Sequence, residues 1–153
     1  PRVVSKEQYS QPQILSGGFA TRMATAAEEI EQITGGDFNP GGLIQNIDMF
    51  GIPDVAANFM RSPQGQRYRQ AQENWITANL RKESGAAIPP EETEREIKKW
   101  FPQPGDSPDV IAQKKRARRD AELSMIKSSG GAFEDLQDQA DKEELEQLRR
   151  EQR

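Results

Sequence analysis

The spacing of the large apolar side chains most constrains what this chain can fold into. They are few, and they recur at intervals of three and four residues, as in the series Phe19, Met23, Ala26, Ile30 and Ile33. That interval places them on one narrow stripe of an α-helix, whereas a strand would require alternation. Because only 33% of the residues are hydrophobic and 30% are charged, material for a core is scarce. We therefore expect an all-α fold, an extended helical hairpin or bundle with Gly/Pro-rich loops, whose stripes are completed by oligomeric partners.

Serine, proline and glycine mark where the helices begin and end. Ser62-Pro63 predicts the start of one helix and Ser84-Gly85 predicts its end. A second helix is expected between Pro89-Pro90 and Pro102, and a third after Ser107-Pro108, beyond a turn over residues 102–109. The first helix is expected to start at Ser16 or Thr21 and to end at Gly35-Gly36.

The rest of the chain divides into a loop, a short helix, a hinge and a tail. Residues 35–53 are rich in glycine and are expected to form a loop that packs over the helices, and residues 54–60 predict a short helix. Residues 128–131 are expected to be a flexible hinge. The charged tail beyond them is expected to be a helix that is frayed or bound to a partner. We therefore divide the chain into a helical assembly domain, 1–129, and a C-terminal tail, 130–153.

The residue types that are missing exclude several classes of chemistry. The chain has no cysteine and no histidine, which excludes thiol nucleophiles, disulfides, imidazole bases and zinc sites built on those residues. We expect no catalytic residue, no metal, no cofactor and no small-molecule substrate. The chain also contains no apolar run of the ~18 to 20 residues that a membrane-spanning helix needs.

Charge is segregated along the chain. The net charge is -4 over residues 1–60, +5 over 61–119 and -5 over 120–153. The basic block includes five cations within one predicted helix: Lys114, Lys115, Arg116, Arg118 and Arg119. These residues are candidates for non-specific contact with DNA phosphates. The alternative is a solvated helix face that pairs with an acidic neighbour, such as the acidic tail.

A second set of residues is expected to pack helices together. It consists of Phe19, Met23, Ile30, Ile33, Tyr68, Trp75, Trp100 and Phe101. Aromatic residues between arginines can stack on nucleic-acid bases. At helical spacing, and with so few other apolar residues, they favour a core instead.

The pair Glu83-Ser84 at a predicted helix end resembles the motif of lytic transglycosylases. In that family a glutamate with a raised pKa acts as the general acid on a glycosidic bond. Arg81 and Lys82 precede this glutamate and would lower its pKa, and the family's other sequence elements are absent. Capping and ion pairing therefore fit Glu83 and Ser84 better.

Residues 61–119 carry a more extensive resemblance. The elements LRKESGAAI, FPQPGDSP and a following helix rich in Lys and Arg resemble a segment of internal virion or DNA-ejection proteins of short-tailed bacteriophages. The preceding Gly18-Phe19-Ala20-Thr21-Arg22-Met23 is also similar to that group. FPQPGDSP is the most specific part.

The resemblance implies a protein of the virion that is packaged near the portal and released into the host cell envelope, where helical subunits assemble a conduit for the genome. The partners it implies are copies of the chain and other virion proteins, namely portal, tail or other ejection proteins. A connector or scaffolding-type protein that docks to the portal or tail is the alternative from the same context. A peptidoglycan-cleaving enzyme that uses Glu83 is the alternative from another class.

Overall fold

The computed structural model describes residues 8–35, 61–103 and 105–152. These residues form five helices and no strand: α1 (Gln11–Gly35), α4 (Pro63–Ser84), α5 (Pro90–Trp100), α6 (Pro108–Ser128) and α7 (Ala132–Glu151). The all-α class expected from the sequence is therefore confirmed for this part of the chain. The predicted helix 54–60, and the predicted loop 35–53 beyond Gly35, lie outside the described residues.

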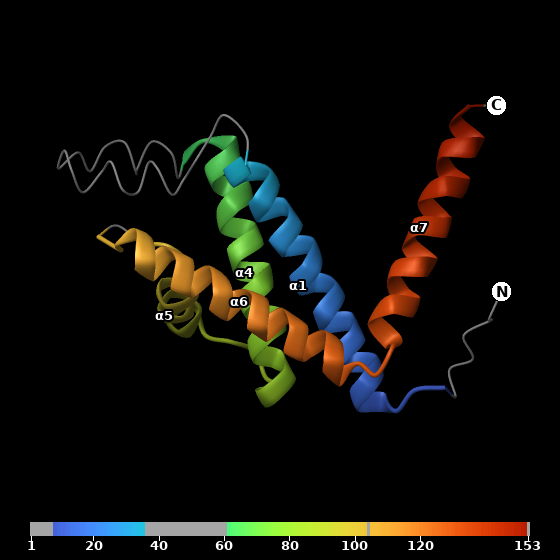
Figure 1. The fold of residues 1–153 in the computed structure, drawn as a ribbon, viewed down its shortest axis with the longest axis horizontal. Coiled ribbons are helices and arrows are strands. Elements are labelled where there is room, and N and C mark those ends of the chain that lie inside the picture. The colour runs from blue at the N-terminus through green and yellow to red at the C-terminus, as the bar shows by residue number, and fades with distance from the viewer. Residues whose placement is uncertain (1–7, 36–60, 104, 153) are drawn as a thin grey trace.

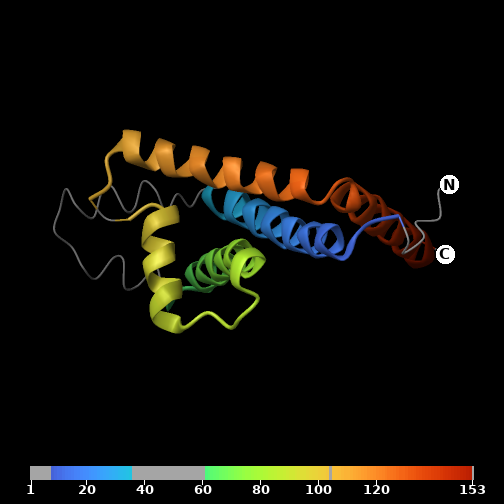
Figure 2. The same ribbon diagram turned by 90° about the horizontal axis from the view of Figure 1, so that it is seen from below.

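Four of the helices pack together as a small bundle, and the fifth stands apart from it. Helix α1 packs against α4, α6 and α7, while α5 packs against both α4 and α6. Seen from below, α1 lies between α4 and α6, and α5 crosses the end of the bundle (Figure 2). Helix α7 touches the bundle at its first turns and then points away from it (Figure 1).

The predicted starts of α4, α5 and α6 are confirmed. The hydroxyl oxygens of Ser62 and Ser107 accept hydrogen bonds from the backbone N–H groups of Gly65 and Val110, and proline occupies the first helical position in both helices. A serine at the N-cap satisfies one of the amide groups that the first turn leaves free. Gly85 ends α4 in the left-handed conformation, with φ of 62°, as the sequence predicted.

The predicted start of α1 was wrong. The helix begins at Gln11, where the side chains of Ser10 and Gln13 exchange hydrogen bonds with each other's backbone N–H groups. This is a capping box. Gly17 does not interrupt the helix because tertiary packing requires a small residue there: a Cβ on Gly17 would lie 3.0 Å from the Cβ of Ala132 in α7.

In place of the flexible hinge predicted at 128–131, the structure has a compact turn. Ser129 is fully buried, and its hydroxyl donates to the carbonyl of Ile126 and accepts from the backbone N–H of Phe133. Gly130 and Gly131 both have positive φ, of 57° and 106°. Glycine adopts these angles without steric cost, which allows the tight turn. The hydrogen bonds of the buried Ser129 hold the turn in place, so it fixes the direction in which α7 leaves the bundle.

Trp75 is the centre of the core. Its side chain is fully buried, with the ring of Trp100 at 5.2 Å in a tilted arrangement and the ring of Phe101 at 5.6 Å edge-on. Met23 and Ile76 are also fully buried in this cluster. All eight residues singled out for helix packing belong to the core or pack against it.

Candidate functional site

The five cations of α6 do not share one face of the helix. Lys114 and Arg118 are four residues apart and point inward, toward the end of α5. Lys115, Arg116 and Arg119 are exposed. The basic run therefore divides into two groups with different surroundings.

Lys114 caps the C-terminus of α5. Its ammonium group donates to the backbone carbonyls of Lys98, at 2.8 Å, and Phe101, at 3.1 Å, and to the carboxylate of Asp106, at 2.6 Å. The last carbonyls of a helix lack partners within the helix and carry partial negative charge, so a cation is stabilising there. Burial alone would raise the pKa of Asp106, but the hydrogen bond from Lys114 holds that pKa below its usual value.

Arg118 completes the same contact one turn later. Its guanidinium donates to the backbone carbonyl of Trp100 at 2.6 Å and lies 4.8 Å from the centre of the Phe101 ring, in a cation–π arrangement. Burial lowers the pKa of Arg118, although an arginine stays charged at neutral pH. Lys114 and Arg118 together fasten α6 to α5.

The other three cations form the outward basic surface of α6: Lys115, Arg116 and Arg119. The ammonium group of Lys115 lies 3.9 Å from a carboxylate oxygen of Glu31, and both side chains are about 70% exposed, so this pair is weak. Arg116 and Arg119 form no hydrogen bond or ion pair with the part of the chain that the structure describes. These two guanidinium groups are available to a partner.

The acidic tail does not cover the basic run within the chain. Helix α7 packs against α1 instead: Ala132 is buried against Gly17, and Asp135 accepts a hydrogen bond from the hydroxyl of Tyr9. Within the described ranges, no ion pair or hydrogen bond joins α7 to the cations of α6. In this structure the tail does not neutralise these cations within the same molecule, because the contact with α1 directs α7 away from them.

Glu122 is a half-buried carboxylate that the sequence does not single out. It accepts a hydrogen bond of 2.8 Å from the indole N–H of Trp75 and lines a cavity of about 160 Å³ with Arg118 and Arg119. Burial raises the pKa of Glu122, and the hydrogen bond and the two arginines offset this only in part. Its position, one residue after Ala121 and four after Arg118, is the sequence feature that places it beside the inner face of α6.

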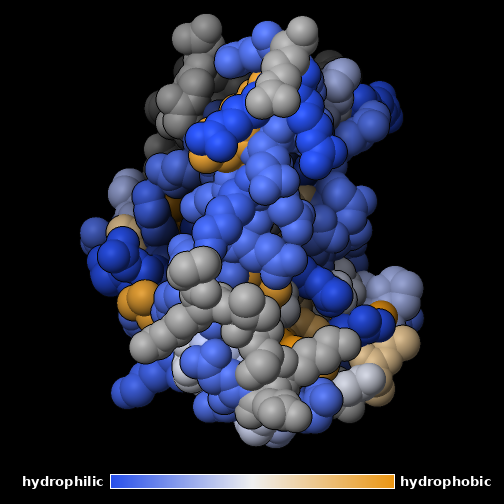
Figure 3. All heavy atoms as spheres, turned by 90° about the vertical axis from the view of Figure 1, so that its right-hand side faces the viewer, coloured by the Kyte–Doolittle hydropathy of each residue, from blue (hydrophilic) through white to orange (hydrophobic). Residues whose placement is uncertain are grey.

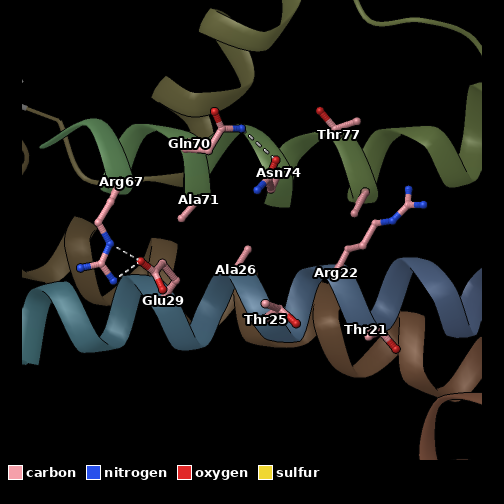
Figure 4. A pocket seen from close by; sticks show the side chains of 11 residues that line it. Thr21, Arg22, Thr25, Ala26, Glu29, Arg67, Gln70, Ala71, Asn74 and Thr77 are labelled. Carbon is pink, nitrogen blue, oxygen red and sulfur yellow. Dashed lines mark hydrogen bonds and ion pairs between the residues drawn. The ribbon is translucent and has the colours of Figure 1, made fainter. Parts of the chain in front are cut away.

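A groove of about 640 Å³ runs between α1 and α4 (Figure 4). Small side chains such as Ala26 and Ala71 line its floor, threonine and amide side chains line its walls, and an ion pair between Arg67 and Glu29 crosses one end. Its polar side chains point along the helices as well as into the groove (Figure 4). Apart from Arg22 and the Arg67–Glu29 pair, its lining side chains are uncharged, so the groove does not indicate a particular reaction or ligand.

The remaining candidate residues lie as follows. Tyr68, Trp75 and Phe101 are buried, and Trp100 is half-buried with its indole N–H bonded to Glu96, so the aromatic set forms core contacts. Burial raises the pKa of Tyr68. Glu83 and Ser84 stand in the last turn of α4. Among the described residues no cluster of three or more potential metal ligands occurs, and no helix has the length and apolar character needed to cross a bilayer.

Comparisons with protein-family models, with curated proteins and with solved structures found no match to this chain.

Proposed function

We propose that this chain is a non-enzymatic structural component of a bacteriophage particle that takes part in ejection of the viral DNA into the host cell. In this role it is packaged near the portal or tail and assembles with other copies into a conduit through the host envelope. The observation that carries the proposal is the resemblance of residues 61–119 to internal virion and DNA-ejection proteins.

The arrangement of those residues supports the proposal. They cover α4, α5 and the first part of α6, which together with α1 form the core around Trp75. The most specific element, FPQPGDSP, contains Phe101, which packs on Trp75, and Asp106, which pairs with Lys114. The sequence element that carries the resemblance is therefore also the one that joins α5 to α6.

The proposed contact with DNA uses the outward basic surface of α6. Three cations that neutralise phosphates give an affinity that falls with salt, with a slope of up to about three in a plot of log affinity against log salt concentration. Replacing Lys115, Arg116 and Arg119 by glutamine should weaken binding to any duplex and flatten that slope. The matched control replaces Lys142, Arg149 and Arg150, also one lysine and two arginines, which lie on α7. Binding that is independent of salt, or equally weak in both variants, contradicts the DNA contact.

The connector or scaffolding-type role is the second candidate, and the exposed outer part of α7 favours it. A chain ending at Gln137 tests it, because it keeps Ala132 and Phe133 in place at the base of α7. If the truncated chain is absent from purified particles, α7 docks the protein and the connector role gains. If the particles contain it but deliver no DNA, the ejection role gains.

Phage particles that lack this chain test the proposed function itself. They should be filled with DNA and adsorb to cells, yet fail to release the genome into them. Normal infection by such particles, or a failure to package DNA, contradicts the ejection role. Particles that carry Glu83→Gln should infect and digest cell wall as before, whereas a loss of digestion would support the peptidoglycan-cleaving alternative.

A further inference from the structure

Helices α6 and α7 have the largest net charges of the described helices, and the two charges are of opposite sign. On α6 the outer stripe consists of Ala112, Arg116, Arg119, Leu123 and Ile126. On α7 the outer stripe consists of Glu134, Asp138, Asp141, Leu145 and Leu148. The residues within each stripe are separated by four, three, four and three positions, so each stripe lies along one side of its helix.

Both stripes face solvent in the structure. Leu123, Leu145 and Leu148 are each exposed by about half, at 52%, 50% and 48%. Every described residue of α7 from Asp138 onward is exposed. Within the α6 stripe only Ile126 is half-buried, because it packs partly against the core of its own molecule. The side of the molecule on which α7 lies is mostly hydrophilic, with hydrophobic residues scattered over it (Figure 3). Exposed leucines on helices that already have a charged surface are a candidate contact for a partner.

The two stripes match each other in one parallel register. When the helices run side by side in the same direction, with each α6 residue opposite the α7 residue 22 positions later, Arg116 meets Asp138 and Arg119 meets Asp141. In the same register Leu123 meets Leu145 and Ile126 meets Leu148. Four of the five positions thus pair opposite charges or apolar side chains, and the fifth places the small Ala112 opposite Glu134. A continuous seam of this kind is what two packed helices form.

The antiparallel alternative pairs the charges but not the leucines. If Arg116 meets Asp141 and Arg119 meets Asp138 in that direction, Leu123 lies opposite Glu134. The apolar side chains therefore favour the parallel register over the antiparallel one.

A parallel contact cannot form within one molecule. Helix α6 has 21 residues and is about 30 Å long, and the start of α7 would have to reach back to the start of α6. Residues 129–131 join the two helices and span at most about 14 Å when extended. They are also held in a compact turn by the buried Ser129. The occupant of the α6 outer stripe must come from another chain.

We propose that the outer stripe of α7 from one copy of this protein docks in parallel on the outer stripe of α6 of a second copy. The contact joins two different surfaces, so it generates either a reciprocal pair or a ring or chain of subunits. It does not depend on the virion role, since it is a property of the purified chain. Because it uses Arg116 and Arg119, an α6 surface occupied by a second copy cannot at the same time bind DNA through these two residues.

Charge exchange in the full-length chain tests the contact. The wild-type protein should self-associate in sedimentation at low salt, and more weakly as salt is raised. Reversing Arg116 and Arg119 to glutamate, or Asp138 and Asp141 to lysine, should each weaken association by about tenfold or more. An equimolar mixture of the two variants, and a chain that carries all four changes, should associate again. Reversal of Arg95 and Lys98, exposed residues of α5, is the matched control for the arginine variant and should leave association unchanged.

The register is tested by cross-linking, which is simple in a chain without cysteine. In one mixture a chain with Leu123→Cys meets a tagged chain with Leu145→Cys, its neighbour in the parallel register. In the other mixture the tagged chain has Glu134→Cys, the neighbour in the antiparallel register. The mixed disulfide should form at least about five times faster in the first mixture. Each chain has one cysteine, so only contacts between two copies are detected. A monomeric wild type, a mixture of charge variants that stays dissociated, or equal cross-linking in both pairs overturns the proposal.

Discussion

Lys114→Ala and Lys115→Ala are adjacent changes of the same residue type, and the structure predicts different effects for them. The side chain of Lys114 is 15% exposed and donates to two carbonyls at the end of α5 and to Asp106. The side chain of Lys115 is 71% exposed and has one distant partner, Glu31. Both changes have the same effect on helix propensity and net charge, so their difference reports the contacts of Lys114 alone.

The expected difference is about 2 kcal/mol in the free energy of unfolding. A hydrogen bond to a charged group contributes about 1.5 to 3 kcal/mol when it is buried, and a cation at a helix C-terminus about 0.3 to 1 kcal/mol. Partial exposure reduces these values, and release of the lysine side chain returns about 1.5 to 2 kcal/mol of entropy. Lys115→Ala should change stability by no more than about 0.5 kcal/mol, as exposed ion pairs do.

Thermal unfolding followed by circular dichroism at 222 nm measures the difference. For a chain of this size, 2 kcal/mol corresponds to a decrease in Tm of roughly 4 to 8 °C for Lys114→Ala. Urea unfolding gives the free energies directly, with both variants at the same low concentration so that self-association does not contribute. If the two variants unfold at the same temperature, Lys114 does not fasten α6 to α5, and the division of the five cations is refuted.

Three further predictions follow from the same contacts. The difference in unfolding free energy between Lys114→Ala and Lys115→Ala should shrink on acidification without vanishing, because the two carbonyl contacts of Lys114 do not titrate. The pKa of Asp106 is lowered, so its contribution is present above about pH 4, the usual value of an aspartate, and is lost as the pH falls through the folded-state value. Urea titrations at several pH values measure this change. Glu122→Gln should raise the free energy of unfolding at pH 7, because glutamine keeps an acceptor for the Trp75 indole and has no charge to bury. It should also reduce the loss of stability that occurs as the pH rises through the raised pKa of Glu122. Lower stability of the variant at pH 7 would show that the charge is favourable where it lies. Gly18→Ala should stabilise α1 by up to about 1 kcal/mol. Gly17→Ala should stabilise the protein less or destabilise it, and should speed hydrogen exchange at the base of α7, since a Cβ meets Ala132 only at Gly17. Equal effects of the two changes would show that α7 does not pack closely on α1.

The sequence was sufficient to predict α4, α5 and α6 because local signals define their ends. Ser62-Pro63 and Ser107-Pro108 supply a hydroxyl cap and a pre-set φ, and Gly85 supplies a left-handed residue, so none of these ends depends on distant contacts. The first turns of α1, before the predicted start at Ser16 or Thr21, were missed although Ser10 and Gln13 have the spacing of a capping box. Gly17 and Gly18 disfavour a helix at this point of the sequence. Glycine is required at position 17 by the close approach of Ala132, which lies more than a hundred residues away in the chain.

The division of the basic run could be predicted only in part. Lys114 and Arg118 share the helical interval with Ala121 and Met125, which places them on the inner stripe of α6. That interval alone gives no reason for two cations on an inner stripe. The reason is the C-terminus of α5, whose carbonyls are brought to this face by the turn at Asp106 and by the packing of Phe101 on Trp75. Contacts of this kind depend on the tertiary arrangement and are invisible to spacing.

A reconstruction of the phage particle at low resolution, with this chain labelled, examines the proposed role in one measurement. We expect several copies arranged as a ring or tube at the portal vertex, in contact with one another, and a loss of their density after the genome has been ejected. Copies distributed over the capsid shell, or a chain that stays at the portal unchanged after ejection, would contradict the role in DNA ejection.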